Sequence, residues 1–208
     1  MKIVIDGLIG AGKSTQVDIL SKITGKSVIK EPIGDWPLDL FYKDPSRWGF
    51  MMQVAVLNSY VKMKESSGIF ERCPQSTHDI FWQNLVESKV VTADENTIFE
   101  KLYKYHSWNP DVIIFIDKSP EKCYEHIQSR NQTGDTGVSM DYLKSLDVLY
   151  TKHFKNNDNI HVIDGNQSIP DVTRDILKII NPILNKSSSE LCNGKQQQKQ
   201  LLDQDVYM

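Results

Sequence analysis

The feature that most constrains this chain lies near its amino end, where residues 7–15 read GLIGAGKST. This stretch has the spacing G-x-x-x-x-G-K-[ST] and directly follows the apolar residues Ile3, Val4 and Ile5. A strand, a glycine-rich turn and a helix in this order are typical of a P-loop, where backbone N–H groups and the positive end of the helix dipole hold a polyphosphate. The sequence therefore predicts a site for ATP or GTP.

Each residue of the loop has an expected role in holding the phosphates. We expect contacts from Gly7, Leu8, Ile9, Gly10, Ala11, Gly12, Lys13, Ser14 and Thr15. The Lys13 ammonium would reach the β- and γ-phosphates, and the Ser14 hydroxyl would bind a Mg²⁺ ion that otherwise keeps waters and phosphate oxygens. A chance glycine-rich turn is the alternative, and the flanking strand and helix disfavour it.

Composition sets broad limits on partners and compartment. A chain of 208 residues with 39% hydrophobic content predicts one soluble domain, and a formal net charge of −3 disfavours nucleic-acid binding. Three widely spaced cysteines without a C-x-x-C motif indicate neither a disulfide framework nor a zinc site. Because a strand begins at residue 2 and no apolar run approaches a membrane span, we expect no targeting peptide, no membrane association and a cytoplasmic location.

Alternating strands and helices predict an α/β fold. Five candidate strands lie near positions 3, 28, 69, 113 and 161, which indicates a five-stranded parallel sheet with helices on both faces. Expected helices cover about 13–24, 48–64, 79–90, 94–108, 140–153 and 169–183, with another beginning at 120. We interpret 32–48 as irregular and 131–137 as a short lid. The kinase-like domain would span 1–184, and the polar tail 185–208 would be disordered.

Charged residues follow two of the expected strands. Glu31 precedes Pro32 at the end of one strand, and Glu71 and Arg72 end another. Ligands gather at the carboxyl ends of parallel strands, so these residues are candidate site residues. Taken alone, Glu31 is equally consistent with an exposed charge, and Arg72 with a surface ion pair to Glu71.

In this order the motifs resemble the deoxynucleoside kinase family over about residues 2–180. The resemblance rests on the P-loop, Glu31-Pro32 with Trp36, the segment 42–50 running into Gln53, and Phe70-Glu71-Arg72 with Ser76, Ile80 and Phe81. Ser119-Pro120-Glu121-Lys122-Cys123 and Asp141-Tyr142-Leu143 extend it. The resemblance implies transfer of the γ-phosphate of ATP, with Mg²⁺, to the 5′-hydroxyl of a deoxynucleoside in nucleotide salvage for DNA synthesis.

The resemblance also implies a role for each matched residue. Glu31 would be the catalytic base, assisted by Arg72, and Glu71 would bind Mg²⁺ beside Ser14. The lid residue Arg130 would neutralise phosphate charge together with Lys13. The implied substrate contacts are Tyr42 and Asp135 to the 3′-hydroxyl, Gln53 to the base edge, Phe81 stacked on the base, and Trp36 closing the pocket. Asp164, Gly165 and Asn166 fall where the family's loop covers the adenine of ATP.

Some positions depart from the family pattern. Deoxycytidine and deoxyguanosine kinases pair an aspartate and an arginine at the positions of Thr77 and Tyr60, and neither charge is present here. With Val56 able to lie near a base methyl group, we expect a pyrimidine preference, thymidine first and deoxycytidine next. His78 replaces a usual arginine, and His126 and Gln132 stand where the lid tends to carry more arginines.

Two other functions compete with this hypothesis. Thymidylate kinase also has a P-loop and a Glu-Pro after its second strand, but it typically shows Arg-Glu-Pro-Gly where this chain has Lys30-Glu31-Pro32-Ile33. A nucleotide-dependent switch with no acceptor is the third possibility. The family further implies a homodimer through paired helices, near residues 50–64 and 79–90.

Overall fold

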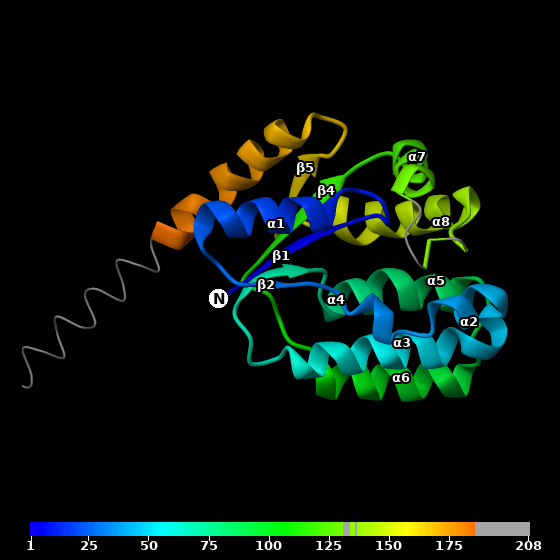
Figure 1. The fold of residues 1–208 in the computed structure, drawn as a ribbon. Coiled ribbons are helices and arrows are strands. Elements are labelled where there is room, and N and C mark those ends of the chain that lie inside the picture. Colours follow the sequence, from blue (N-terminus) through cyan, green and yellow to red (C-terminus); the bar gives the residue numbers. More distant parts are fainter. Residues whose placement is uncertain (131–133, 136, 186–208) are drawn as a thin grey trace, which may run out of the picture.

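The computed structural model describes residues 1–130, 134–135 and 137–185. Its centre is a parallel five-stranded sheet with the strand order β2-β3-β1-β4-β5 (Figure 1). The strands are β1 (Lys2–Gly7), β2 (Val28–Ile29), β3 (Gly68–Glu71), β4 (Val112–Asp117) and β5 (Ile160–Asp164). The predicted fold class and all five strands are confirmed.

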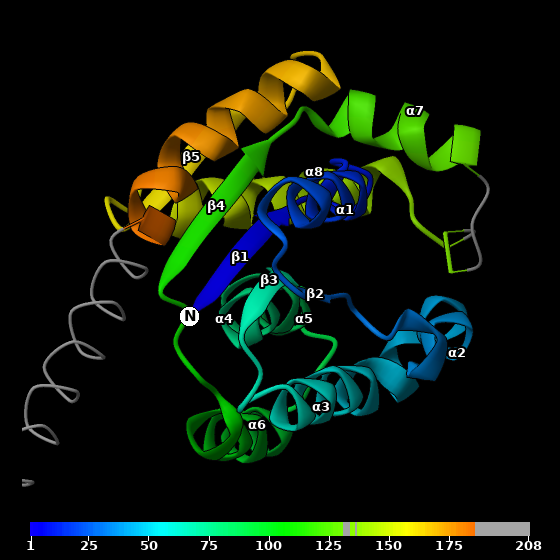
Figure 2. The same ribbon diagram turned by 60° about the vertical axis from the view of Figure 1, so that its left-hand side comes forward.

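Apolar runs explain why the middle of the sheet is buried. Ile3, Ile5 and Ile114 are at most 1% exposed, as expected for strands covered on both faces. The flanking helices supply this cover, and α3 and α6 lie side by side at one end of the molecule (Figures 1 and 2). The carboxyl ends of the central strands are thereby held in a fixed arrangement.

Several helix ends follow from local sequence. α1 (Lys13–Thr24) ends at Gly25, whose φ of 67° suits a residue without a side chain. α6 (Ala93–His106) starts with a capping box, in which Thr92 accepts from the Glu95 N–H and Glu95 accepts from the Thr92 N–H. The approximate bounds expected for these two helices are confirmed.

The interpretation of 32–48 as irregular is wrong in part. The structure contains α2 (Leu38–Lys43), and α3 (Pro45–Lys62) begins earlier than expected. Pro37 directly precedes α2, and Pro45 is the first residue of α3. A missing N–H costs nothing at a helix start, so these two prolines begin helices and do not interrupt them. Asp44 caps α3 by accepting from the Arg47 N–H.

The helix expected over 79–90 also differs. The chain forms α4 (Pro74–Ser76), a π-helical turn over Thr77–Trp82, and α5 (Gln83–Glu87). A second π-helical turn, Thr151–Lys155, follows α8 (Met140–Tyr150). These wide turns carry i→i+5 hydrogen bonds, which apolar periodicity does not predict.

The remaining segments complete the domain. They are a short 3₁₀ turn over Ile33–Asp35, α7 (Pro120–Arg130) and a helix over 169–185. The tail is predicted to be disordered over 185–208, but residue 185 is still helical. Residues 186–208 and lid residues 131–133 and 136 lie outside the described residues. Within the described part of the chain, no helix has the length and apolar character needed to cross a membrane.

Candidate active site

A cavity of about 530 Å³ lies between the P-loop, β3, α3 and the lid. The P-loop contributes Ile9, Gly10, Gly12, Lys13, Ser14 and Thr15 to its wall. Other predicted residues that line it are Glu31, Trp36, Tyr42, Gln53, Glu71, Arg72, Phe81, Arg130 and Asp135. The fold therefore brings the expected phosphate, catalytic and acceptor residues around one space.

The P-loop backbone can adopt its shape only with glycine at key positions. Gly10 has a φ of +85°, and a Cβ there would lie 2.4 Å from the Cys123 carbonyl oxygen. Gly12, at a φ of +97°, directly precedes α1. The loop thus leads into a helix start whose free N–H groups suit an anion.

Lys13 is placed for a phosphate. Its Nζ donates to the Leu8 carbonyl oxygen over 2.8 Å, within the loop itself. Burial, with a further contribution from Arg72, lowers the pKa of Lys13 to about 8, against the opposing effect of nearby carboxylates. An anionic phosphate beside this ammonium would stabilise its charged form.

Ser14 and Glu71 meet as a Mg²⁺ site would require. The Ser14 hydroxyl donates to Glu71 Oε1 over 2.8 Å, which joins the first turn of α1 to the end of β3. These are oxygen ligands, the kind Mg²⁺ prefers, and Mg²⁺ usually takes its other ligands from phosphates and water. Two protein oxygens that leave the other positions to phosphate and water fit Mg²⁺ brought with a nucleotide. Among the described residues there is no cluster of three or more His, Cys, Asp or Glu that could hold a metal.

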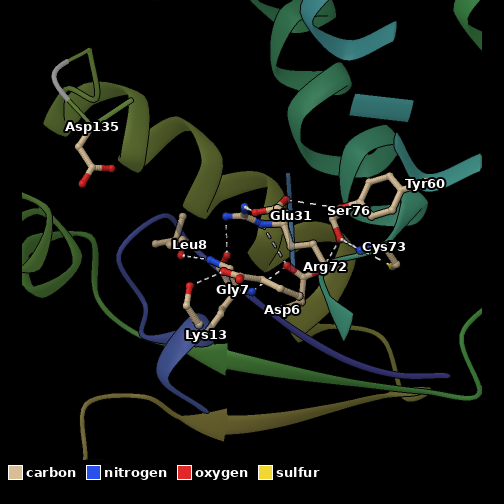
Figure 3. A network of polar contacts seen from close by, with 12 residues as sticks. Asp6, Gly7, Leu8, Lys13, Glu31, Tyr60, Arg72, Cys73, Ser76 and Asp135 are labelled. Atoms are coloured by element: carbon tan, nitrogen blue, oxygen red, sulfur yellow. Dashed lines mark hydrogen bonds and ion pairs between the residues drawn. The ribbon is translucent and has the colours of Figure 1, made fainter. Parts of the chain in front are cut away.

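Glu31 and Arg72 form a buried ion pair in front of the P-loop (Figure 3). Arg72 Nη1 donates to Glu31 Oε2 over 2.7 Å, and Nη2 donates to the Gly7 carbonyl oxygen over 3.1 Å. Both side chains are 8% exposed. Neither an exposed Glu31 nor a surface pair of Arg72 with Glu71 describes this arrangement.

The charges of this pair are strongly coupled. Burial raises the pKa of Glu31 above its ordinary value, while the Arg72 guanidinium opposes that rise. Burial alone would lower the pKa of Arg72, but Glu31 and its other neighbours hold it well above its usual range. A carboxyl with a raised pKa close to a fixed cation is suited to accept a proton from an alcohol.

Other residues that line the cavity give it the character of a nucleoside pocket. Gln53 is 3% exposed, and its Oε1 has no hydrogen-bond partner in the described structure; the same is true of Trp36 Nε1. The Phe81 ring lies 4.9 Å from the Arg72 guanidinium carbon. Tyr42 lines the cavity, and burial raises its pKa to about 12, so it is a neutral donor. A ring with polar edge groups would satisfy these buried atoms.

The model of one protein family matches most of this chain. That family is described as deoxynucleoside kinase, and the match covers residues 3–188. The chain belongs to the deoxynucleoside kinase family. This membership agrees with the resemblance found in the sequence and favours a nucleoside acceptor over a nucleoside monophosphate.

Individual relatives of this kinase differ in their named substrates. The deoxyadenosine kinase of Dictyostelium discoideum is 34% identical over 158 residues, which are 71% of this chain and 64% of that protein. The 143R protein of Invertebrate iridescent virus 6 is 32% identical over 191 residues, or 88% of this chain and 97% of that protein. A solved deoxyadenosine kinase from M. mycoides with bound dCTP has a TM-score of 0.79 at 25% identity, covering 88% of this chain and all of that one. Proteins named thymidine kinase and deoxycytidine kinase match too, so the names do not select one base.

Two lid residues of the kinase contact each other. Arg130 Nε and Nη2 donate to Asp135 Oδ2 and Oδ1 over 2.7 and 2.8 Å. We expected Arg130 to contact phosphate and Asp135 to contact a 3′-hydroxyl. Both line the cavity, but in this structure each is the other's partner, and Asp135 lies apart from the Glu31–Arg72 pair (Figure 3).

Sequence reasoning did not identify Tyr60 as a contact of Glu31, the residue expected to act as the catalytic base. Its hydroxyl donates to Glu31 Oε1 over 3.4 Å, so Tyr60 and Arg72 hold the two oxygens of the same carboxylate (Figure 3). Tyr60 lies seven residues after Gln53 on α3, which puts both on one face of the helix. That spacing could have identified Tyr60.

Some predicted nucleotide contacts lie outside the cavity wall. Leu8 and Ala11 are P-loop residues with buried side chains, and Gly7 ends β1. Asp164 ends β5, and Gly165 and Asn166 form the turn after it, where the Gly165 N–H donates to the Asp117 carbonyl oxygen over 2.8 Å. Their contact with adenine stays a prediction. His126 lines the cavity, and its Nδ1 lies 3.1 Å from the Gly10 carbonyl oxygen.

Proposed function

We propose that this kinase transfers the γ-phosphate of ATP to the 5′-hydroxyl of a pyrimidine deoxynucleoside, thymidine first and deoxycytidine next. The reaction would serve nucleotide salvage for DNA synthesis. The observation that carries the proposal is the buried Glu31–Arg72 pair, which lines the same cavity as the P-loop residue Lys13. An alcohol in that cavity would meet a base and a cation in front of the phosphates.

Each reacting group has a residue suited to it. Glu31 would take the proton of the 5′-hydroxyl as the oxygen attacks phosphorus, and Arg72 would hold that hydroxyl and offset developing negative charge. Lys13 would stabilise charge on the phosphates. Ser14 and Glu71 would hold Mg²⁺, which supplies charge neutralisation to the triphosphate when bound.

The pyrimidine preference is supported by the uncharged base end of the cavity. Thr77 lines the cavity and is 2% exposed, and the Tyr60 hydroxyl donates its hydrogen bond to Glu31. Val56 and Met52 add apolar wall. A thymine methyl group suits such a surface, and the Gln53 amide can both donate to and accept from a pyrimidine edge.

A panel of acceptors tests this proposal. Purified protein would be given ATP and Mg²⁺ with thymidine, deoxycytidine, deoxyadenosine or deoxyguanosine, and ADP release would be measured for each. We expect kcat/KM to be highest for thymidine and next for deoxycytidine. Turnover of a purine deoxynucleoside equal to or above that of thymidine would overturn the preference but leave the kinase chemistry intact.

Gln53→Met should move stability and substrate binding in opposite directions. The change removes a buried acceptor that has no partner, so the free energy of unfolding should rise by about 1 kcal/mol. The dissociation constant for thymidine should rise at least about tenfold, because a hydrogen-bonded amide contact to the base is lost. Chemical denaturation and calorimetric titration measure the two effects. Gln83→Met, on α5 and outside the cavity wall, is the matched control, and unchanged thymidine affinity in Gln53→Met would reject the assigned contact.

We also propose a homodimer and a cytoplasmic location. The expected pairing surface lies near residues 50–64 and 79–90, and the exposed Met51 on α3 supports it in the first of these ranges; the exposed Ile98 and Tyr105 lie on the adjacent helix α6, outside both. Sedimentation equilibrium of the purified chain tests the dimer, and a monomer at micromolar concentration would reject it.

A further inference from the structure

Asp6 is a buried carboxylate with no part in the proposed chemistry. It is 0% exposed, and three donors surround it. The Gly7 N–H donates to Oδ1 over 2.7 Å, the Tyr150 hydroxyl donates to Oδ1 over 2.8 Å, and the Ser76 hydroxyl donates to Oδ2. We call Asp6, Ser76 and Tyr150 the Asp6 cluster. Its members come from β1, α4 and α8, so it fixes one carboxylate relative to three elements.

The cluster faces the side of Arg72 that Glu31 does not occupy. Asp6 Oδ1 lies 3.7 Å from Arg72 Nε, which is an ion pair without a hydrogen bond. Nε is buried and has no hydrogen-bond partner in the described structure. The guanidinium therefore lies between two carboxylates, and Asp6 is the one held in place by other donors (Figure 3).

The backbone conformation of Arg72 is one that surrounding contacts must stabilise. Arg72 has a φ of 60°, in the left-handed region that residues with a side chain seldom adopt, directly after the last residue of β3. Strained conformations persist where surrounding contacts determine them. The backbone contact from the Arg72 N–H to the Ile5 carbonyl oxygen, at 3.1 Å, sets the position of the chain but not the direction of the guanidinium.

We propose that Asp6 is a positioning residue for catalysis, which orients the Arg72 guanidinium toward Glu31 and the reacting hydroxyl. The inference rests on the roles assigned to Glu31 and Arg72 under Proposed function. The fixed charge of Asp6 attracts the Nε side of the guanidinium, so that Nη1 remains directed at Glu31. Without that charge, the guanidinium of Arg72 would keep its hydrogen bonds to Glu31 and the Gly7 carbonyl oxygen and its contact with the Phe81 ring, but no fixed charge would hold its Nε side.

The Asp6→Asn variant separates the charge from the shape. Asparagine can still accept from the Gly7 N–H and the Tyr150 hydroxyl, and the Ser76 hydroxyl can turn to accept from its amide. Only the attraction to Arg72 is lost. We expect kcat with thymidine to fall on the order of 100-fold, as misplacement of a catalytic group does, with dissociation constants for ATP and thymidine within about 3-fold of wild type. Asp111→Asn, an exposed aspartate beside the other end of the sheet, is the matched control and should keep wild-type kcat.

Two further variants make each outcome decisive. Glu31→Gln is assayed in parallel. If Glu31→Gln keeps wild-type turnover, the proposed function fails. If Glu31→Gln is inactive but Asp6→Asn is fully active, only the positioning role of Asp6 is rejected. If Asp6→Asn does not fold, Tyr150→Phe decides, because it keeps the ring and removes one donor to Asp6, together with the contact of that hydroxyl with the Gly7 carbonyl oxygen. It should lower kcat about 10-fold at unchanged substrate affinity. Wild-type kcat in the folded variant would overturn the inference. A fall in kcat would also overturn it if the fraction of the protein that binds ATP fell by the same factor.

Discussion

Replacing Glu31 with glutamine is expected to lower kcat by about 10²–10⁴-fold, the usual contribution of a general base. Glutamine keeps the size of the side chain, and its one oxygen can still accept from Arg72 while its NH2 group faces the Tyr60 hydroxyl, but it cannot take a proton at neutral pH. Binding of ATP and Mg²⁺ should stay within a few-fold of wild type, since Glu31 is not among the residues assigned to either. Steady-state ADP release and a nucleotide titration measure the two quantities.

Two comparisons make this prediction specific. Glu65→Gln, at an exposed site outside the cavity wall, should have wild-type kcat. In the wild type, the ionised form of Glu31 is the base and burial raises its pKa, so kcat/KM should rise with pH through an apparent pKa above the 4.5 of a free glutamate. A Glu31→Gln variant with more than a tenth of wild-type kcat would contradict the assigned role.

Arg72→Met should have the second large effect, on stability and activity together. It leaves the buried carboxylates of Glu31 and Asp6 without their cation, and breaking a buried ion pair in this way costs about 3–5 kcal/mol. Turnover should fall by at least about 100-fold, because a preorganised donor to the reacting groups is lost. Urea denaturation gives the free energy of unfolding, and ADP release gives kcat.

A double-mutant cycle shows whether the pairing causes this loss. Adding Glu31→Gln to Arg72→Met removes one stranded charge, so the double variant should recover part of the lost stability. Arg174→Met is the control, because Arg174 forms an exposed pair with Asp171 whose loss should hardly change the free energy of unfolding. A loss in Arg72→Met no larger than that of the control would be incompatible with the buried pair described here.

Much of the fold could be predicted from the sequence because its strongest signals are local. The apolar run Val112–Ile116 is buried on both faces, and the P-loop fixes the first strand, turn and helix. The segment around α2 could not be predicted in the same way, because proline is common both in loops and at helix starts, and only the structure shows that Pro37 and Pro45 lie at helix starts. The π-helical turn over Thr77–Trp82 depends on packing that no residue spacing reveals.

The closeness of Glu31 and Arg72 was predictable because it follows from the sheet topology. Parallel strands end at one edge of a sheet, so charges that follow β2 and β3 must be neighbours, and the structure places Glu31 beside Arg72. The residues that hold this pair were not predictable in the same way. Tyr60 and Tyr150 approach from α3 and α8, and their contacts require the packed helices as well as the left-handed conformation of Arg72.

The lid shows a second limit of sequence reasoning. Arg130 and Asp135 are five residues apart, and each was assigned a separate ligand contact. The structure pairs them with two hydrogen bonds. A match to a family motif indicates which ligand a residue contacts in a complex with that ligand. The contacts in this structure follow from which charged side chains lie close to each other.

The distance from the 5′-oxygen of bound thymidine to the carboxylate of Glu31 tests the central claim most directly. It would be measured in a crystal structure of the protein with thymidine, Mg²⁺ and a non-hydrolysable ATP analogue. We predict about 2.6–3.2 Å from that oxygen to Glu31, with the terminal phosphate of the analogue on the opposite side of the oxygen. A nucleoside bound with its 5′-oxygen directed away from Glu31 and Arg72 would contradict the proposed mechanism.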